Sequence, residues 1–266
     1  RGNEIYSWSG ATGNWSRGSL PSAIENYVPQ AADPRTYLVV DDAAPQSAHT
    51  YDGNIYLPKN DMFLTLGGGV YNSGDIYQTR NAAGELVRAG PWLWDPNKAD
   101  ANKVGGTTGS GYNPTTLGGN MWTNRQGAWS GTEPRSYSNN TAAYRTEGDR
   151  DVVYITAPAQ YSGAPALYRY TLGDVRNGGT DIWERIGETY NAPSGQGTAV
   201  IDSRHNLYVH TAAITGRTID LGVWDLGKSN AVNSDLNRDI AAHLVNPDGS
   251  AFEVNINHGI AYDETS

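Results

Sequence analysis

The sequence predicts an all-β fold built from repeated four-stranded antiparallel units, with very little helix. Its composition suits short strands joined by tight turns, because Gly is abundant (32 residues) and Tyr (17) and Trp (8) far outnumber Phe (2) and Met (2). Pairs of short apolar strands also recur along the chain. First strands marked by Tyr144, Ile201 and Tyr262 are 57 and 61 residues apart, and each of these spacings fits one four-stranded unit.

The clearest unit is expected over residues 141–190. Apolar segments at 142–145 and 152–155 flank a turn at 147–149, which predicts a β-hairpin. An aromatic third strand and a Trp-bearing fourth strand follow this hairpin. They are expected at residues 166–170 and 181–186.

Two more units are expected, at residues 47–94 and 195–255. In each, a hairpin of two short apolar strands precedes a third strand that contains an aromatic residue. The strands are expected at 54–57, 62–66 and 75–78 in the first unit, and at 198–202, 207–210 and 219–226 in the second.

The remaining segments predict incomplete units. Residues 3–24 suit the outer strands of one unit, and residues 256–266, with a strand at 259–263, suit the start of another. Residues 95–140 form a Gly-rich insertion or a degenerate unit, of which 95–135 is expected to lie outside the regular sheets and to carry a specific contact. We therefore expect a single β-propeller domain over residues 1–266, as an incomplete ring or a fragment completed by self-assembly or by the rest of the polypeptide; a two-sheet sandwich is the alternative.

Several motifs resemble the Kelch repeat, in particular that of the bacterial galactose-oxidase-like central domain. They are the run Ser-Ala-His-Thr-Tyr at 47–51, the run Ile-Tyr-Leu-Pro at 55–58, the double glycine at Gly67 and Gly68, and the Trp-bearing strand around Trp183. The resemblance implies a Kelch-type propeller of four-stranded antiparallel blades. The copper-radical oxidases of that superfamily use a Tyr crosslinked to a Cys. Because this chain has no Cys, their activity is not expected, and neither is any cofactor.

A propeller would gather four polar side chains at one place. Since first strands line the central channel, His49 and His258 are expected at one channel mouth, with Asn140 and Gln196 at comparable positions. Such a circle of polar side chains would bind a polar ligand. The alternative is that these side chains cap strand ends and contact water.

Four Trp residues lie within and beside the Gly-rich segment. Exposed indoles there would stack on sugar rings, whereas buried indoles would pack in the core. The candidates for glycan contact are Trp92, Trp94, Trp122 and Trp129.

Alternating oxygen-bearing residues give one candidate calcium site. The run lacks the glycine and the terminal glutamate of an EF-hand loop. Other acidic residues fall mostly in turns, where Asp commonly accepts hydrogen bonds from nearby backbone amides, so no catalytic set is assigned. The candidate Ca²⁺ ligands are Asn233, Asp235, Asn237 and Asp239.

The charge and hydropathy of the chain restrict its partners. A formal charge of −9, from 19 basic and 28 acidic residues, argues against a nucleic-acid partner. No apolar run approaches the roughly 18 residues that cross a bilayer. We expect an extracytoplasmic protein, secreted or on the cell surface, that acts as a non-catalytic binding or scaffold module for a protein or a glycan. The alternative is a carbohydrate-active hydrolase or lyase with its site at the channel mouth.

Overall fold

The chain, studied as a computed structural model, divides into two compact units. Unit 1 comprises Arg1–Thr50 and Tyr56–Gly127, and unit 2 comprises Tyr51–Ile55 and Ala128–Ser266. The residues that the structure describes are 3–22, 27–29, 38–40, 44–69, 76–81, 83–105, 120–158, 165–187, 196–213, 217–218, 220–228, 245–250, 253–254 and 259–263.

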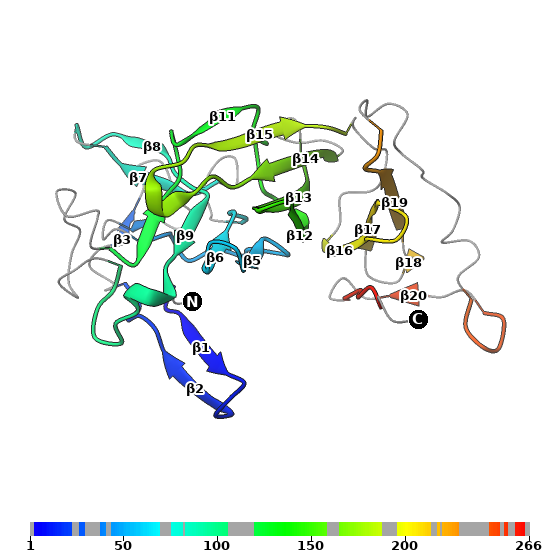
Figure 1. The fold of residues 1–266 in the computed structure, drawn as a ribbon, viewed down its shortest axis with the longest axis horizontal. Coiled ribbons are helices and arrows are strands. Elements are labelled where there is room, and N and C mark those ends of the chain that lie inside the picture. Colours follow the sequence, from blue (N-terminus) through cyan, green and yellow to red (C-terminus); the bar gives the residue numbers. More distant parts are fainter. Residues whose placement is uncertain are drawn as a thin grey trace. The chain divides into compact units, whose positions relative to one another are not determined.

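β-Strands dominate both units, and the described residues contain short 3-10 helices but no α-helix (Figure 1). The all-β prediction is therefore confirmed. The elements of unit 1 are β1 (Tyr6–Ser9), β2 (Asn14–Arg17), β3 (Tyr27–Pro29), β4 (Leu38–Val40), β5 (Asn54–Leu57), β6 (Met62–Thr65), β7 (Gln78–Arg80), β8 (Leu86–Arg88), β9 (Trp92–Trp94), η2 (Pro96–Lys98) and β10 (Trp122–Asn124). The strand β5 crosses the boundary, since its first two residues, Asn54 and Ile55, belong to unit 2. Those of unit 2 are β11 (Trp129–Gly131), β12 (Thr141–Glu147), β13 (Arg150–Pro158), β14 (Pro165–Thr171), η4 (Val175–Asn177), β15 (Asp181–Arg185), β16 (Gln196–Asp202), β17 (Leu207–Ala213), β18 (Arg217–Thr218), β19 (Asp220–Asp225) and β20 (Glu253–Val254).

A four-stranded sheet with the order β10-β9-β6-β5 forms the centre of unit 1. Its strand β9 has partners on both sides, since Trp94 pairs in register with Phe63 of β6 and with Trp122 of β10. The hairpins β1–β2, β3–β4 and β7–β8 are separate two-stranded sheets. The buried core of unit 1 consists of Ala44, Tyr77, Ala89, Trp92, Trp94, Val104, Met121 and Trp122.

The third strand of this sheet differs from the prediction. The hairpin expected at 54–57 and 62–66 is confirmed as β5 and β6, but the third position belongs to β9 and not to residues 75–78. Every residue of β9 is buried. Such a short, wholly apolar strand gains most by pairing next to β6, whose residues are also largely buried. Gln78 instead begins β7 in a separate hairpin.

The segment 95–135 also differs from expectation at both described ends. Rather than lying outside the sheets, it supplies the edge strand β10 in unit 1 and the edge strand β11 in unit 2. Trp122 explains why β10 joins the sheet of unit 1, because its indole is buried and packs edge-to-face on Phe63 with ring centroids 6.3 Å apart. The glycine-rich run at 106–119 lies outside the described residues.

A five-stranded sheet with the order β11-β15-β14-β13-β12 forms one half of unit 2. β12, β13, β14 and β15 follow one another as antiparallel neighbours, so the four strands predicted for 141–190 are confirmed. The added strand β11 is parallel to β15. Gly131 allows this close approach, since its φ is +98° and a Cβ there would lie 1.9 Å from the Trp183 carbonyl oxygen.

A three-stranded sheet with the order β16-β17-β19 packs on the five-stranded sheet in unit 2. It confirms the strands predicted at 198–202 and 207–210 and the third strand predicted within 219–226. Tyr208 joins the two sheets: its buried hydroxyl donates to the Thr141 carbonyl oxygen at 2.9 Å, and its ring centroid lies 6.5 Å from that of Tyr154. The core between the sheets contains Ala143, Val152, Tyr154, Leu167, Ala199, Tyr208 and Trp224.

The strand predicted at 259–263 is not formed. These residues are described and carry no strand. Within them, Tyr262 makes a side-chain hydrogen bond with Asp202, the last residue of β16.

The double glycine after β6 has a direct steric reason. His49 and Gly69 form a bridge in which each backbone N–H donates to the other carbonyl at 3.0 Å. This bridge brings the His49 carbonyl onto Gly68, where a Cβ would lie only 2.1 Å from that oxygen. Gly68 also has a φ of +142°, which other residues rarely adopt.

We predict that Gly68→Ala destabilises the protein by at least about 2 kcal/mol, because the bridge at His49 must break or shift. Gly84→Ala is the matched control: Gly84 has a φ of +80°, but its Cβ would meet no atom within 4 Å. The control should show only the strain of a left-handed residue, about 1 kcal/mol. Urea unfolding of both variants measures the difference, and equal losses would contradict the steric explanation.

Candidate functional site

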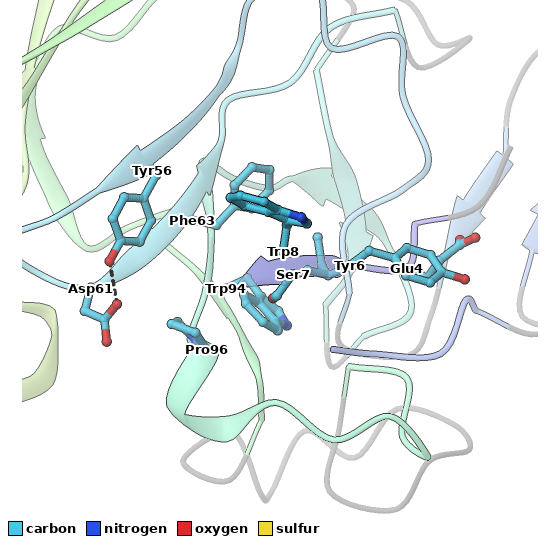
Figure 2. A pocket seen from close by; sticks show the side chains of 10 residues that line it. Glu4, Tyr6, Ser7, Trp8, Tyr56, Asp61, Phe63, Trp94 and Pro96 are labelled. Atoms are coloured by element: carbon cyan, nitrogen blue, oxygen red, sulfur yellow. Dashed lines mark hydrogen bonds between the residues drawn. The ribbon is translucent and has the colours of Figure 1, made fainter. Parts of the chain in front are cut away.

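A pocket of about 440 Å³ opens on unit 1 and is lined largely by aromatic side chains (Figure 2). Figure 2 shows the Trp8 indole between Phe63 and Trp94 in that view, with the Tyr56–Asp61 pair on one side and Tyr6 and Glu4 on the other. Carboxylates therefore lie near both ends of an aromatic surface. The lining residues are Glu4, Ile5, Tyr6, Ser7, Trp8, Tyr56, Asp61, Phe63, Trp94 and Pro96.

One wall of the pocket comes from β1 and the residues before it. Tyr6 and Trp8 are alternate residues of β1 and therefore point to the same face, and Glu4 lies two residues before Tyr6. Tyr6 and Trp8 remain 54% and 56% exposed, although such large rings are more often covered in a core. The β1–β2 hairpin thus presents two aromatic rings and a carboxylate to one space.

Backbone and hydroxyl hydrogen bonds fix the base of this hairpin. The Ile5 carbonyl accepts from the Gly18 N–H at 2.7 Å, and the Ile5 N–H donates to the buried Ser19 hydroxyl at 3.0 Å. The Gly18 carbonyl in turn accepts from the Asp100 N–H at 2.9 Å. These bonds hold β1 against the segment that follows η2.

Trp94 forms the inner side of the pocket. It is 3% exposed in the middle of the four-stranded sheet. Gly18 lies against its indole, since a Cβ on Gly18 would come within 2.6 Å of Trp94 Cζ2. A glycine at this position therefore lets the hairpin approach the sheet closely.

Asp61 is held in place at the other end of the pocket. Its Oδ1 accepts from the Tyr56 hydroxyl at 2.7 Å, and its Oδ2 accepts from Asn97 Nδ2 at 2.9 Å. Asp61 has a φ of +51°, a turn conformation that Asp tolerates better than most residues. Tyr56, which is 55% exposed, is in this way fixed without being buried.

Glu4 differs from Asp61 in its partners. Its Oε2 atom is buried, yet it has no hydrogen-bond partner among the residues that the structure describes. A buried carboxylate oxygen without a donor is costly, and sites of this kind are commonly completed by a ligand or by water. Glu4 Oε2 is therefore an acceptor in the pocket lining that the described residues leave without a donor.

The site combines two features that suit sugar recognition. Exposed aromatic rings offer flat apolar faces on which a sugar ring can pack. Carboxylate oxygens offer acceptors for hydroxyl or amine donors at the ring edge.

Among the residues predicted for glycan contact, most are placed in the core. Trp92, Trp94 and Trp122 are buried, so the core alternative describes their packing, and only Trp94 also lines the pocket. Trp129 begins β11 and is half-buried.

The residues predicted for the channel mouth fall in both units. His49 in unit 1 is exposed, with its backbone bonded to Gly69. Asn140 in unit 2 is fully buried, and its Nδ2 donates to the Tyr137 carbonyl at 2.7 Å, which suits the strand-capping alternative. Gln196 begins β16, where only its backbone is described, and His258 lies outside the described residues. The calcium candidates Asn233, Asp235, Asn237 and Asp239 also lie outside them.

Sequence reasoning did not single out Glu4, Tyr6, Trp8, Tyr56 or Asp61 as site residues. The alternation of Glu4, Tyr6 and Trp8 could have indicated one strand face with unusual aromatic content. No local signal brings that face together with Tyr56 and Asp61, because the two segments are about fifty residues apart.

Two buried ionisable groups in unit 2 serve its packing. Oδ2 of Asp52 accepts from the N–H groups of Ala142 in β12 and Ala199 in β16, both at 3.0 Å, so one carboxylate joins the first strands of two sheets. Burial raises the pKa of Asp52 to about 6, although these hydrogen bonds oppose the rise. Burial lowers the pKa of His210 to about 4, and its ring centroid lies 5.2 Å from that of Trp224.

The part of the chain that the structure describes contains no cluster of three or more His, Asp or Glu residues suited to a metal ion. It also contains no helix long and apolar enough to cross a bilayer. Comparison with protein-family models, with curated proteins and with solved structures gives no match to this chain.

We predict that Asp52→Asn stabilises the protein more at pH 7 than at pH 3.5. The folded pKa of Asp52, about 6, lies above its ordinary value of 3.8, so its ionisation opposes folding. Its contribution to stability is greatest below about pH 3.8 and is lost as the pH rises to about 6. Asn keeps an oxygen for both backbone N–H groups and carries no charge, so the difference between variant and wild type should change by about 2 kcal/mol over this range.

Denaturant unfolding of both proteins across this pH range makes the measurement. His210 acts in the opposite direction, because its neutral form favours the folded state and stability is lost as the pH falls from 6.5 to about 4. It is present in both proteins and cancels in the comparison. A difference between them that does not change with pH would contradict the assignment of a raised pKa to Asp52.

Proposed function

We propose that this chain is a non-catalytic binding module that holds a glycan in the pocket of unit 1. The observation that carries the proposal is the exposure of Tyr6, Trp8 and Tyr56, each more than half accessible, around one pocket that also has two carboxylates. Exposed rings gathered at a concave site mark a binding surface more strongly than the same rings scattered singly.

The geometry favours a ligand with flat apolar faces and polar edges. Sugar rings have this character, because their C–H groups face aromatic rings while their hydroxyl groups reach acceptors at the rim. Asp61 is held by Tyr56 and Asn97, so this side of the pocket is fixed before a ligand binds. A preorganised rim of this kind costs little entropy on binding.

The same proposal includes a Kelch-type β-propeller at the cell exterior. Its support is the run of four antiparallel strands β12 to β15, the packing of the sheet β16-β17-β19 on it, and the steric need for glycine at Gly68. The absence of Cys is compatible with an extracytoplasmic protein held by its core. A protein partner in place of a glycan stays a prediction.

The alternative function is a carbohydrate-active enzyme, which would cleave the glycan that it binds. Incubation of the chain with glycans would release new reducing or unsaturated ends. A binding module leaves the glycan intact. A reducing-end assay run on every glycan that binds separates the two.

We predict that Trp8→Ala weakens binding to a glycan array hit by at least about tenfold, because it removes the most exposed indole of the pocket. Trp15→Ala is the matched control. Trp15 pairs directly with Trp8 across the hairpin and is 70% exposed, but it does not line the pocket. Isothermal titration calorimetry measures both affinities.

The control should keep the wild-type affinity within about twofold. Equal losses for the two variants would place recognition on the hairpin surface and not in the pocket. No loss for Trp8→Ala, or no glycan bound by the wild type, would contradict the proposed function.

A further inference from the structure

We infer that the pocket selects glycans that carry a free, protonated amine, such as oligomers of a 2-amino-2-deoxy sugar. The inference rests on the proposed function and specifies the ligand class of the same site. Three observations carry it: the charge of the lining, the free oxygen of Glu4 and the rings beside it.

The lining is acidic and has no positive charge of its own. Glu4 and Asp61 are both among the ten lining residues that the structure describes, and none of the ten is Lys, Arg or His. The net charge of the whole chain is −9. A cation entering this pocket gains electrostatic energy, whereas an acidic sugar would be repelled.

The nearest positive charge on the hairpin lies across from Tyr6. Arg17 is the register partner of Tyr6, is exposed, and is not part of the lining. Its charge is therefore solvated and does not neutralise the pocket from within. Arg17 provides a control for a general effect of charge on this hairpin.

The two carboxylates have different capacities. Both oxygens of Asp61 already accept a hydrogen bond, from Tyr56 and from Asn97. Glu4 Oε2 is buried and has no donor among the described residues. An ammonium group offers three donors and a full charge, so it satisfies Glu4 better than a neutral hydroxyl does.

Aromatic rings next to Glu4 add to this preference. Tyr6 and Trp8 lie on one face of β1, and Glu4, two residues before Tyr6, lines the same pocket. The face of a Tyr or Trp ring attracts a cation within about 6 Å of its centre. A neutral N-acetyl group at the same sugar position lacks both this attraction and the ion pair with Glu4.

The test is calorimetric titration of the full 266-residue chain at about pH 5.5, where a sugar amine is protonated. The probes are tetramers of β-1,4-linked glucosamine, of N-acetylglucosamine and of glucose. We expect the glucosamine tetramer to bind at least tenfold more tightly than the other two, and this advantage to shrink as salt is raised.

Two variants assign the effect to Glu4. Glu4→Gln keeps the shape of the side chain and should reduce the advantage of the glucosamine tetramer to less than about threefold. Arg17→Gln should preserve the full advantage. Circular dichroism and the urea midpoint of each variant confirm that it is folded.

The outcomes separate this inference from the proposed function. Equal binding of the three tetramers would overturn the amine preference and leave glycan binding intact. Binding of none of the tetramers or of any glycan on an array would overturn both. An advantage that persists in Glu4→Gln would overturn the inference as stated, because Glu4 would not be the partner of the amine.

Discussion

The contact of the Trp94 indole with its surroundings is the interaction on which unit 1 depends. Trp94 pairs with Phe63 on one side and Trp122 on the other, so it fixes the register of three strands at one level. Gly18 lies on the same ring and brings the β1–β2 hairpin to the sheet. Because the hairpin carries Tyr6 and Trp8, the position of a core residue decides where the exposed rings of the pocket lie. The core packing around Trp94 and the shape of the pocket therefore depend on the same contact in unit 1.

Unit 2 uses aromatic residues in a related way. Tyr208 fills the space between two sheets and donates its hydroxyl to the Thr141 carbonyl of the facing sheet. Asp52 joins the same two sheets through the backbone of Ala142 and Ala199. Tyr suits this role because its ring contributes buried area while its hydroxyl bonds a buried polar group that would otherwise lack a hydrogen-bond partner.

The sequence predicted those strands whose signal is local. The strands β12 to β15 were predictable because apolar alternation and tight turns lie within fifty residues of one another. The sequence did not predict the strands β9 and β10. Their pairing spans the glycine-rich run and depends on the burial of Trp94 and Trp122 against Phe63. The pocket was missed for the same reason. Glu4, Tyr6 and Trp8 gain a role only when the fold sets them beside Tyr56 and Asp61, and no periodicity records that long-range proximity.

The most direct test of this account is a crystal structure of the chain soaked with the glucosamine tetramer. The account predicts electron density for a sugar ring against Trp8 in the unit 1 pocket, with its amine in hydrogen-bond contact with Glu4. It also predicts that Trp94 and Gly18 keep the contact that they make in the free protein. Density for the sugar at another surface, or a pocket closed by movement of the β1–β2 hairpin away from Trp94, would contradict it.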